Sequence, residues 1–168
     1  MKIIIIQGMT CLGKSTLCKQ LEKDILNCKH FSLDEYKENM WDKFGFDSEK
    51  QRESQSKLAK ELFYYDINEV IREKLYDYIL IDAPPTLGGW VMNILCASDR
   101  VIIPVEASPW GMFGLANMFE FLNEVKQITP ELEVAGIAVT KVDTRKSYYK
   151  QTMETLHELE DIHVFEQI

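Results

Sequence analysis

Residues 8–15 have the sequence Gly-Met-Thr-Cys-Leu-Gly-Lys-Ser, which fits the pattern G-x-x-x-x-G-K-S. Four consecutive isoleucines at 3–6 precede this segment, and a helical pattern over 16–27 follows it. Gly8 and Gly13 let the chain turn tightly, so that successive backbone N–H groups face one point, and the start of a helix adds the positive end of its dipole. A strand, a glycine-bearing loop and a helix in this order predict a phosphate-binding loop in an α/β fold.

The side chains that end the loop have separate expected roles. Lys14 would bridge the β- and γ-phosphates of ATP, which makes it a candidate catalytic residue, and the Ser15 hydroxyl would bind Mg²⁺. We therefore expect ATP and Mg²⁺ as ligands. The residues expected to contact the nucleotide here are Gly8, Met9, Thr10, Cys11, Leu12, Gly13, Lys14, Ser15 and Thr16.

Apolar runs typical of buried strands alternate with helical patterns along the whole chain. Runs of Ile, Val and Leu without polar alternation are typical of parallel strands covered by helices on both faces. We expect one domain over 1–168, a doubly wound, mostly parallel sheet in a three-layer P-loop sandwich. The expected strands are Lys2–Gln7, Lys29–Leu33, Tyr78–Asp82, Arg100–Val105, Val134–Thr140 and, more weakly, Ile162–Phe165.

Two longer helices are indicated between these strands. A capping box at 48–51 opens the first, whose core-facing stripe is expected to include Leu58, Leu62, Phe63 and Ile67. The second carries a similar stripe over 115–125 and ends before Pro130.

Charge and hydropathy exclude several classes of partner. The chain has a formal net charge of −8, and nucleic-acid affinity depends on clustered Lys and Arg, so we do not expect a nucleic-acid partner. No apolar run approaches the roughly 20 residues that span a bilayer, and the isoleucine run lacks a small-residue cleavage site. We therefore expect a cytoplasmic protein without a membrane partner.

Asp82 ends the apolar run Tyr78–Asp82, at the carboxyl edge of a buried strand where α/β sheets collect ligands. The interpretation we favour is that Asp82 holds Mg²⁺ through water beside Ser15 and contributes to catalysis. The alternative is that it caps the following turn.

The first part of the chain, 1–76, resembles small P-loop kinases that act on nucleic-acid ends or small metabolites. The resemblance rests on the phosphate loop, the segment His30–Tyr36 and the long charged helix that follows. It implies that Asp34 contacts or deprotonates the acceptor hydroxyl, as a carboxylate facing the γ-phosphate could. The alternative, given equal weight, is that Asp34 is the N-cap of the next helix.

The second part, 77–168, resembles partition ATPases of the ParA/MinD type. The resemblance rests on the segments Tyr76–Pro85, Ala97–Val105 and Thr140–Asp143. It implies that Asp-Ala-Pro-Pro at 82–85 is a switch that senses the γ-phosphate. It also implies an ATP-dependent homodimer, although Met9 occupies the place of the lysine that reaches across that dimer.

Because the two resemblances meet near Tyr76, they suggest that the chain is a chimera that was either recombined or engineered. Neither part shows an arginine finger, which is worth roughly 10³–10⁵ in rate, so we expect slow turnover.

The segment Thr140-Lys141-Val142-Asp143 differs from the guanine-binding pattern Asn-Lys-x-Asp at its first residue. We therefore favour ATP over GTP. Asp143 is a candidate contact to the base, and the favoured alternative is that it caps the next helix.

The function expected first is Mg²⁺-dependent ATP binding with slow hydrolysis or phosphoryl transfer to a small-molecule acceptor, with Asp34 as base. The alternatives are an ATP-driven dimerisation switch of the ParA/MinD type, and a recombined fold that binds nucleotide without an evolved activity.

Overall fold

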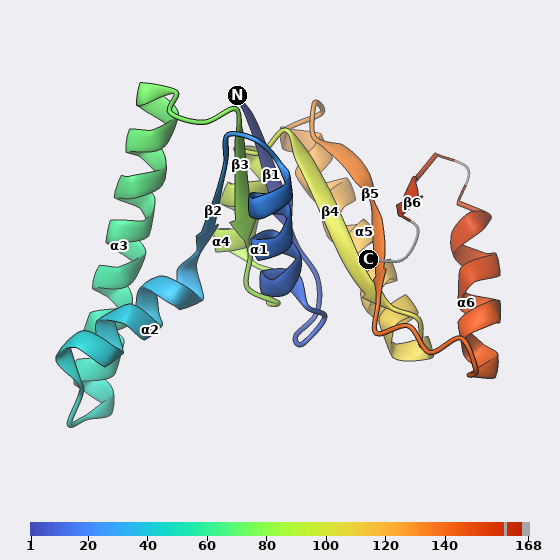
Figure 1. The fold of residues 1–168 in the computed structure, drawn as a ribbon, viewed down its shortest axis with the longest axis horizontal. Helices are drawn as coiled ribbons and strands as arrows, with labels where there is room; N and C mark the ends of the chain where they lie inside the picture. The colour runs from blue at the N-terminus through green and yellow to red at the C-terminus, as the bar shows by residue number, and fades with distance from the viewer. Residues whose placement is uncertain (160, 166–168) are drawn as a thin grey trace.

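The computed structural model describes residues 1–159 and 161–165, and its centre is a six-stranded sheet in the order β2-β3-β1-β4-β5-β6 (Figure 1). Every neighbouring pair of strands is parallel, as the apolar runs predicted. The chain starts at the middle of the sheet, fills one side and then the other, which is the doubly wound arrangement. The strands are β1 (Lys2–Ile6), β2 (Cys28–Ser32), β3 (Tyr78–Asp82), β4 (Arg100–Glu106), β5 (Glu133–Thr140) and β6 (Val164–Phe165).

Helices cover both faces of the sheet, with α1 on one face and α4 and α5 on the other (Figure 1). The three-layer sandwich is therefore confirmed. Helices α2 and α3 pack on each other as a hairpin beside β2. The helices are α1 (Lys14–Asp24), α2 (Leu33–Phe44), α3 (Glu49–Glu73), α4 (Gly89–Cys96), α5 (Pro109–Ile128) and α6 (Ser147–His157).

The two faces of the sheet have cores of different size. The larger core packs strand side chains such as Ile79 and Ile103 against Phe63 of α3, Leu95 of α4 and Leu122 of α5. The core on the other face is small, because α1 is the one helix of residues 1–159 and 161–165 that covers it. Burial of apolar area at about 25 cal/mol per Å² makes the larger face the main source of stability.

The stripe expected on α3 was only partly right. Phe63 and Ile67 are buried, whereas Leu58 and Leu62 remain 47% and 42% exposed. These two leucines face a groove against α2 instead of the sheet core. The predicted cap of this helix is confirmed, because the Ser48 side chain accepts a hydrogen bond from the Gln51 N–H.

Six of the twelve expected strand ends match those of the structure, and the other six differ by one or two residues. Helix α1 begins at Lys14, two residues before the expected start, which brings Lys14 and Ser15 into the first turn of the helix. In the described part of the chain, no helix combines the length and apolarity needed to cross a bilayer.

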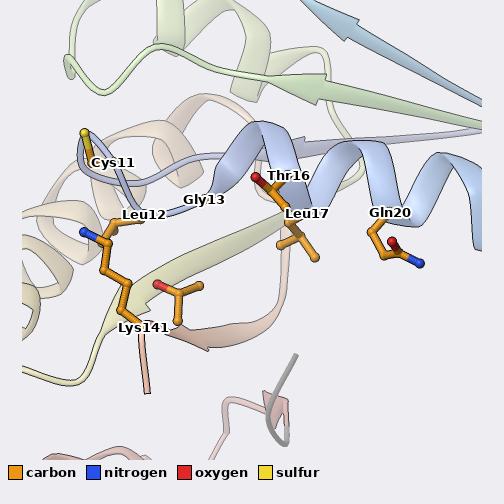
Figure 2. Close-up of a pocket in the computed structure, with 8 residues that line it drawn as sticks. Cys11, Leu12, Gly13, Thr16, Leu17, Gln20 and Lys141 are labelled. Atoms are coloured by element: carbon orange, nitrogen blue, oxygen red, sulfur yellow. The ribbon is translucent and has the colours of Figure 1, made fainter. Parts of the chain in front are cut away.

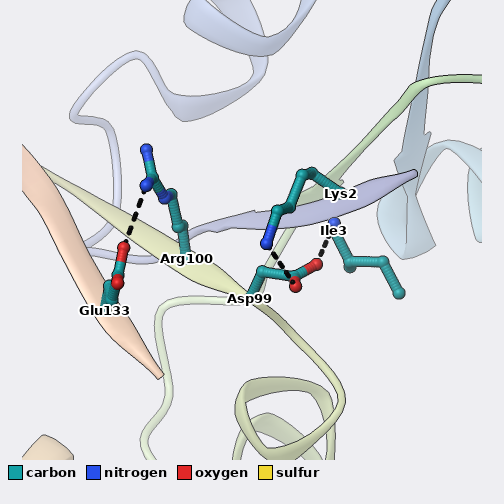
Figure 3. A network of polar contacts seen from close by, with 5 residues as sticks. All are labelled: Lys2, Ile3, Asp99, Arg100 and Glu133. Carbon is teal, nitrogen blue, oxygen red and sulfur yellow. Dashed lines mark hydrogen bonds and ion pairs between the residues drawn. The ribbon is translucent and has the colours of Figure 1, made fainter. Parts of the chain in front are cut away.

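Asp99 joins β4 to the start of β1 at the amino edge of the sheet (Figure 3). Its carboxylate accepts hydrogen bonds from the Ile3 N–H at 2.7 Å and from Lys2 Nζ at 3.1 Å, and its own N–H donates to the Ile3 carbonyl. Burial alone would raise the pKa of Asp99, but the hydrogen bonds from Ile3 and Lys2 outweigh it and hold the pKa below its usual value.

We expect Asp99→Ala to lower the free energy of unfolding by about 1–2 kcal/mol at pH 7, because it removes a charge-assisted hydrogen bond and leaves the Ile3 N–H unpaired. A lowered native pKa means that this stability is present above the unfolded-state pKa of about 3.9 and is lost as pH falls through the native value. Urea unfolding of both proteins from pH 7 to pH 3 measures the difference. Asp24→Ala, at an exposed carboxylate on α1, is the control, and a difference that does not narrow in acid would contradict the assignment.

Candidate functional site

The loop 7–13 connects β1 to α1 at the carboxyl edge of the sheet. The loop requires glycine at position 8, because its backbone lies close to β4 and a Cβ there would lie 2.8 Å from the Pro104 carbonyl oxygen. Gly13 has φ 75°, and Cys11 has φ 61°, which is uncommon for a residue with a side chain. The loop is therefore wound as the glycine spacing predicted, with the first N–H groups of α1 at its end.

Lys14 lies in the first turn of α1, and its side chain folds back over the loop. The Nζ atom donates to the carbonyl oxygens of Gly8 at 3.0 Å and Met9 at 2.9 Å. Burial lowers the pKa of Lys14, while the charges of Asp82 and Asp34 act in the opposite direction. An ammonium group that is desolvated and has only carbonyl partners gains by meeting an anion, so this arrangement suits a phosphate group.

Ser15 and Asp82 meet although they are 67 residues apart in the chain. Strand β3 pairs with β1 in a register that sets Asp82 opposite Ile6, just before the loop. The Ser15 hydroxyl donates to Asp82 Oδ2, and Asp82 is buried. Burial raises the pKa of Asp82, against the hydrogen bond from Ser15 and the charge of Lys14. The fold brings these two residues together, as predicted from the sequence.

The same pair supplies the oxygen ligands that Mg²⁺ prefers, one hydroxyl and one carboxylate. Among the described residues there is no cluster of three or more His, Cys, Asp or Glu side chains placed to hold a metal. A magnesium ion at Ser15 and Asp82 would therefore complete its shell with water and phosphate oxygens, which is usual for Mg²⁺.

Asp34 lies in the first turn of α2, and Ser32 occupies the N-cap position of that helix. The N-cap alternative for Asp34 is therefore wrong, because the helix begins at Leu33 and Asp34 is its second residue. Its exposed carboxylate contacts Lys37 Nζ at 2.9 Å. The role of general base stays a prediction.

A cavity of about 520 Å³ lies beside the second half of the loop (Figure 2). Its walls come from the start of α1 and from the segment that follows β5, where Lys141 has φ 53°. The sequence analysis placed one residue of this segment, Asp143, near the base. That Thr140 and Lys141 line the cavity depends on how strands far apart in the chain pair. The described lining residues are Cys11, Leu12, Gly13, Thr16, Leu17, Gln20, Thr140 and Lys141.

Asp143 does not cap the helix that follows it. Helix α6 begins at Ser147 with Lys146 at its N-cap, and Asp143 instead closes the turn before it by accepting hydrogen bonds from Arg145 N–H and Nε. The Arg145 guanidinium and N–H lower the pKa of Asp143. Asp143 is not among the described residues that line the cavity, so its contact to a base stays a prediction.

Gln7 is a residue that the sequence analysis missed. Its side chain is fully buried, and neither amide atom has a hydrogen-bond partner among the described residues. The sequence held one signal that Gln7 is unusual, because a polar residue here directly follows four isoleucines at the end of a strand.

Part of the chain matches a known protein family. The family model of the AAA domain (AAA_31) matches residues 45–134, which is more than half of the chain. The match begins just after α2 and runs through α3, β3 and β4 to the start of β5, and therefore includes Asp82.

Two similar curated proteins are partition proteins. The chain is 37% identical over 94 residues to the chromosome partitioning protein ParA of Myxococcus xanthus, covering 55% of this chain and 33% of that protein. It is 38% identical over 80 residues to the chromosome-partitioning ATPase Soj of Thermus thermophilus, covering 47% and 32%. The chain thus spans about a third of the length of the curated relatives it matches.

Solved structures share the fold along the whole chain. Cobyrinic acid a,c-diamide synthase from Mycobacterium smegmatis, with a bound ATP analogue and magnesium, has a TM-score of 0.69 at 15% identity, covering 99% of this chain and 86% of that one. The Cyanothece McdA–ATP complex has a TM-score of 0.66 at 16% identity, covering 100% and 83%.

These findings give no support to a kinase-like part over 1–76 or to a chimera. The family match crosses position 76 without interruption, and β3, from the second part, pairs on both sides with strands of the first. The chain belongs to the AAA domain family, as a P-loop protein of the ParA/MinD type.

Proposed function

We propose that this protein binds ATP with Mg²⁺ at the loop 8–15 and uses the nucleotide as a switch of the partition type. The observation that carries the proposal is the meeting of Lys14, Ser15 and Asp82 at one sheet edge. Without a ligand, burial disfavours the charged forms of both Lys14 and Asp82. A polyanion and a divalent cation would relieve both costs at once.

The nucleotide would lie along the loop, with its phosphates on the N–H groups at the start of α1 and its base toward the 520 Å³ cavity. Lys14 would exchange its two carbonyl partners for phosphate oxygens. Ser15 and Asp82 would hold Mg²⁺, the hydroxyl directly and the carboxylate through water, and the metal would neutralise phosphate charge. The similarity to a chromosome-partitioning ATPase and the ATP bound in the solved McdA complex support ATP over GTP.

A partition-type switch is better supported than phosphoryl transfer to a small acceptor. The similar curated proteins named above are partition proteins, and the Asp34 carboxylate contacts Lys37 and is exposed. The segment 83–87 directly follows Asp82 and contains Pro84 and Pro85, which make it stiff. A movement of Asp82 when the metal binds or leaves would therefore be transmitted to this segment. Slow turnover remains our expectation.

An ATP-dependent homodimer is part of this proposal. Met9, at the place of the lysine that crosses the dimer in partition ATPases, packs its side chain on Gly114 of α5. Nearby on the same helix, Trp110 and Phe113 are 77% and 62% exposed. We propose that apolar contact replaces the missing charge at this face, in line with the role of aromatic residues at interfaces.

Titration of ATP in Mg²⁺ and in EDTA tests the metal site. We expect Mg²⁺ to raise the affinity of the unmodified protein by about tenfold or more, and Ser15→Ala to lose most of that gain, because one ligand and the Asp82 contact disappear. Ser54→Ala, at an exposed hydroxyl on α3, should keep it. If Mg²⁺ raised the ATP affinity of Ser15→Ala as much as that of the unmodified protein, Ser15 would not be a magnesium ligand.

Light scattering with ADP and with ATP·Mg²⁺ tests the switch. We expect the mass to double only with ATP. Binding without a change in mass would reject the switch and leave the nucleotide site standing.

A further inference from the structure

Met9, near the start of the phosphate loop, packs its side chain against the backbone of α5 at Gly114. A Cβ at Gly114 would meet the Met9 Sδ atom and would lie 2.9 Å from its Cγ, so a larger residue does not fit while Met9 keeps its position. Gly114 lies inside a 20-residue helix and has no positive φ. Because glycine inside a helix is less stable than alanine, the contact with Met9 is the feature that accounts for glycine here.

The space between Met9 and α5 leaves the side chain no room to move inward. A void of only about 10 Å³ remains there, bounded by Met9, Gly114 and Leu115 among others, and this is no more than the space of one water. On its other side, Met9 borders a cavity of about 170 Å³ and is 43% exposed. A Met9 side chain forced off Gly114 would therefore move outward and take the start of the loop with it.

The backbone of the same residue contacts the loop lysine. The Met9 carbonyl oxygen accepts a hydrogen bond from Lys14 Nζ at 2.9 Å, and the neighbouring Gly8 carbonyl accepts one at 3.0 Å. Gly8 lies against Pro104 of β4, and Met9 lies against Gly114 of α5. The start of the loop, and with it the position of the Lys14 ammonium, is therefore fixed by close contacts with two different elements.

We propose that Met9 is a positioning residue for the phosphate loop: its side chain, held on Gly114, fixes the start of the loop in the geometry that receives phosphate. This inference rests on the proposed nucleotide site, and it adds α5 as the element that sets the loop. The Met9 side chain acts through the loop backbone and Lys14, and not by touching the phosphates.

A double-mutant cycle at positions 9 and 114, measured by calorimetric titration of ATP·Mg²⁺, tests this role. We expect Gly114→Ala to weaken binding about tenfold, because the added methyl group displaces Met9 and the loop with it. Met9→Ala should weaken binding about threefold, because the loop loses its contact with α5. In the Met9→Ala background, Gly114→Ala should change the affinity by less than about twofold, because the smaller side chain leaves room for the methyl group.

Gly89→Ala is the matched control, since a Cβ at this first residue of α4 meets nothing within 4 Å. It should leave the affinity for ATP·Mg²⁺ within about twofold. Melting temperatures separate the clash from the change in helix propensity. Gly114→Ala should lower the melting temperature of the unmodified protein and raise that of Met9→Ala, because alanine favours a helix wherever it fits.

Backbone ¹⁵N signals of Gly8 and Lys14 test the Met9–Gly114 contact without nucleotide. In the nucleotide-free protein, Gly114→Ala should shift both signals, and the double variant should return them to their positions in Met9→Ala. If the unmodified protein did not bind ATP·Mg²⁺, the proposed function would fail, and these signals alone would decide whether Met9 positions the loop.

Three results would each overturn the inference: an affinity for ATP·Mg²⁺ unchanged by Gly114→Ala, an equal loss from Gly114→Ala with methionine and with alanine at position 9, or loop signals that Gly114→Ala does not move. If Gly114→Ala did not fold, Met9→Ala would decide the matter, since unchanged affinity in that variant would mean that the Met9 side chain does not position the loop.

Discussion

Replacing Lys14 by alanine should lower the affinity for ATP·Mg²⁺ by roughly a hundredfold, which corresponds to about 3 kcal/mol. The side chain is buried over the loop, and its ammonium already lies within hydrogen-bond distance of the Gly8 and Met9 carbonyl oxygens. Phosphate oxygens at this place would form charge-assisted bonds in a water-poor environment, which are stronger than neutral ones. Calorimetric titration of ATP·Mg²⁺ into both proteins measures the effect.

The matched control is Lys23→Ala, which removes an exposed lysine from the last turn of the same helix. An exposed charge at that distance contributes little, so the affinity should stay within about twofold. Lys14→Ala should also remain folded, because Lys14 lies over the loop and belongs to neither hydrophobic core. If Lys14→Ala bound as tightly as the unmodified protein, the phosphates would have to lie elsewhere.

Phe63→Ala should lower the free energy of unfolding by about 3–5 kcal/mol, the largest loss of stability that we expect from a single change. Phe63 is 0% exposed at the centre of the larger core. Its ring packs edge-on against Phe31 of β2 and Tyr36 of α2 and lies 5.8 Å from the Trp90 ring of α4. Truncation leaves a cavity where α3 meets β2, α2 and α4.

Urea unfolding followed by circular dichroism measures this loss. Phe44→Ala, which removes a ring that is 60% exposed at the end of α2, serves as the control and should change stability by no more than about 0.5 kcal/mol. Similar losses in both variants would mean that the α2–α3 hairpin, and not the contact with the sheet, limits stability.

The proposed nucleotide site was largely predictable because its parts are local in sequence. Gly8, Gly13, Lys14 and Ser15 lie within one strand-loop-helix unit, where backbone geometry fixes how close they come. Asp82 was predictable for a different reason, because parallel strands end at a common edge of the sheet.

Predictions that depended on one helix boundary or one helix face failed. One of two equally weighted alternatives made Asp34 an N-cap, but it lies inside α2, while Asp143 was expected to cap α6 and closes the preceding turn. Leu58 and Leu62 fit the periodicity of a buried stripe, but α3 turns them toward the groove with α2. Local patterns leave such shifts of two or three residues undetermined.

The sequence by itself determined the loop, the α/β class and the parallel strands, because glycine placement and unbroken apolar runs act through local backbone geometry and burial. Only the tertiary structure decided which distant residues share a cavity. The pairing of β1 with β3 and β4 brings Asp82 to Ser15 and Pro104 to Gly8, and the packing of α5 beside the loop sets Met9 against Gly114 and closes the wall around Gln7. These contacts join residues up to about a hundred positions apart, so they depend on how the whole sheet assembles and not on any one segment.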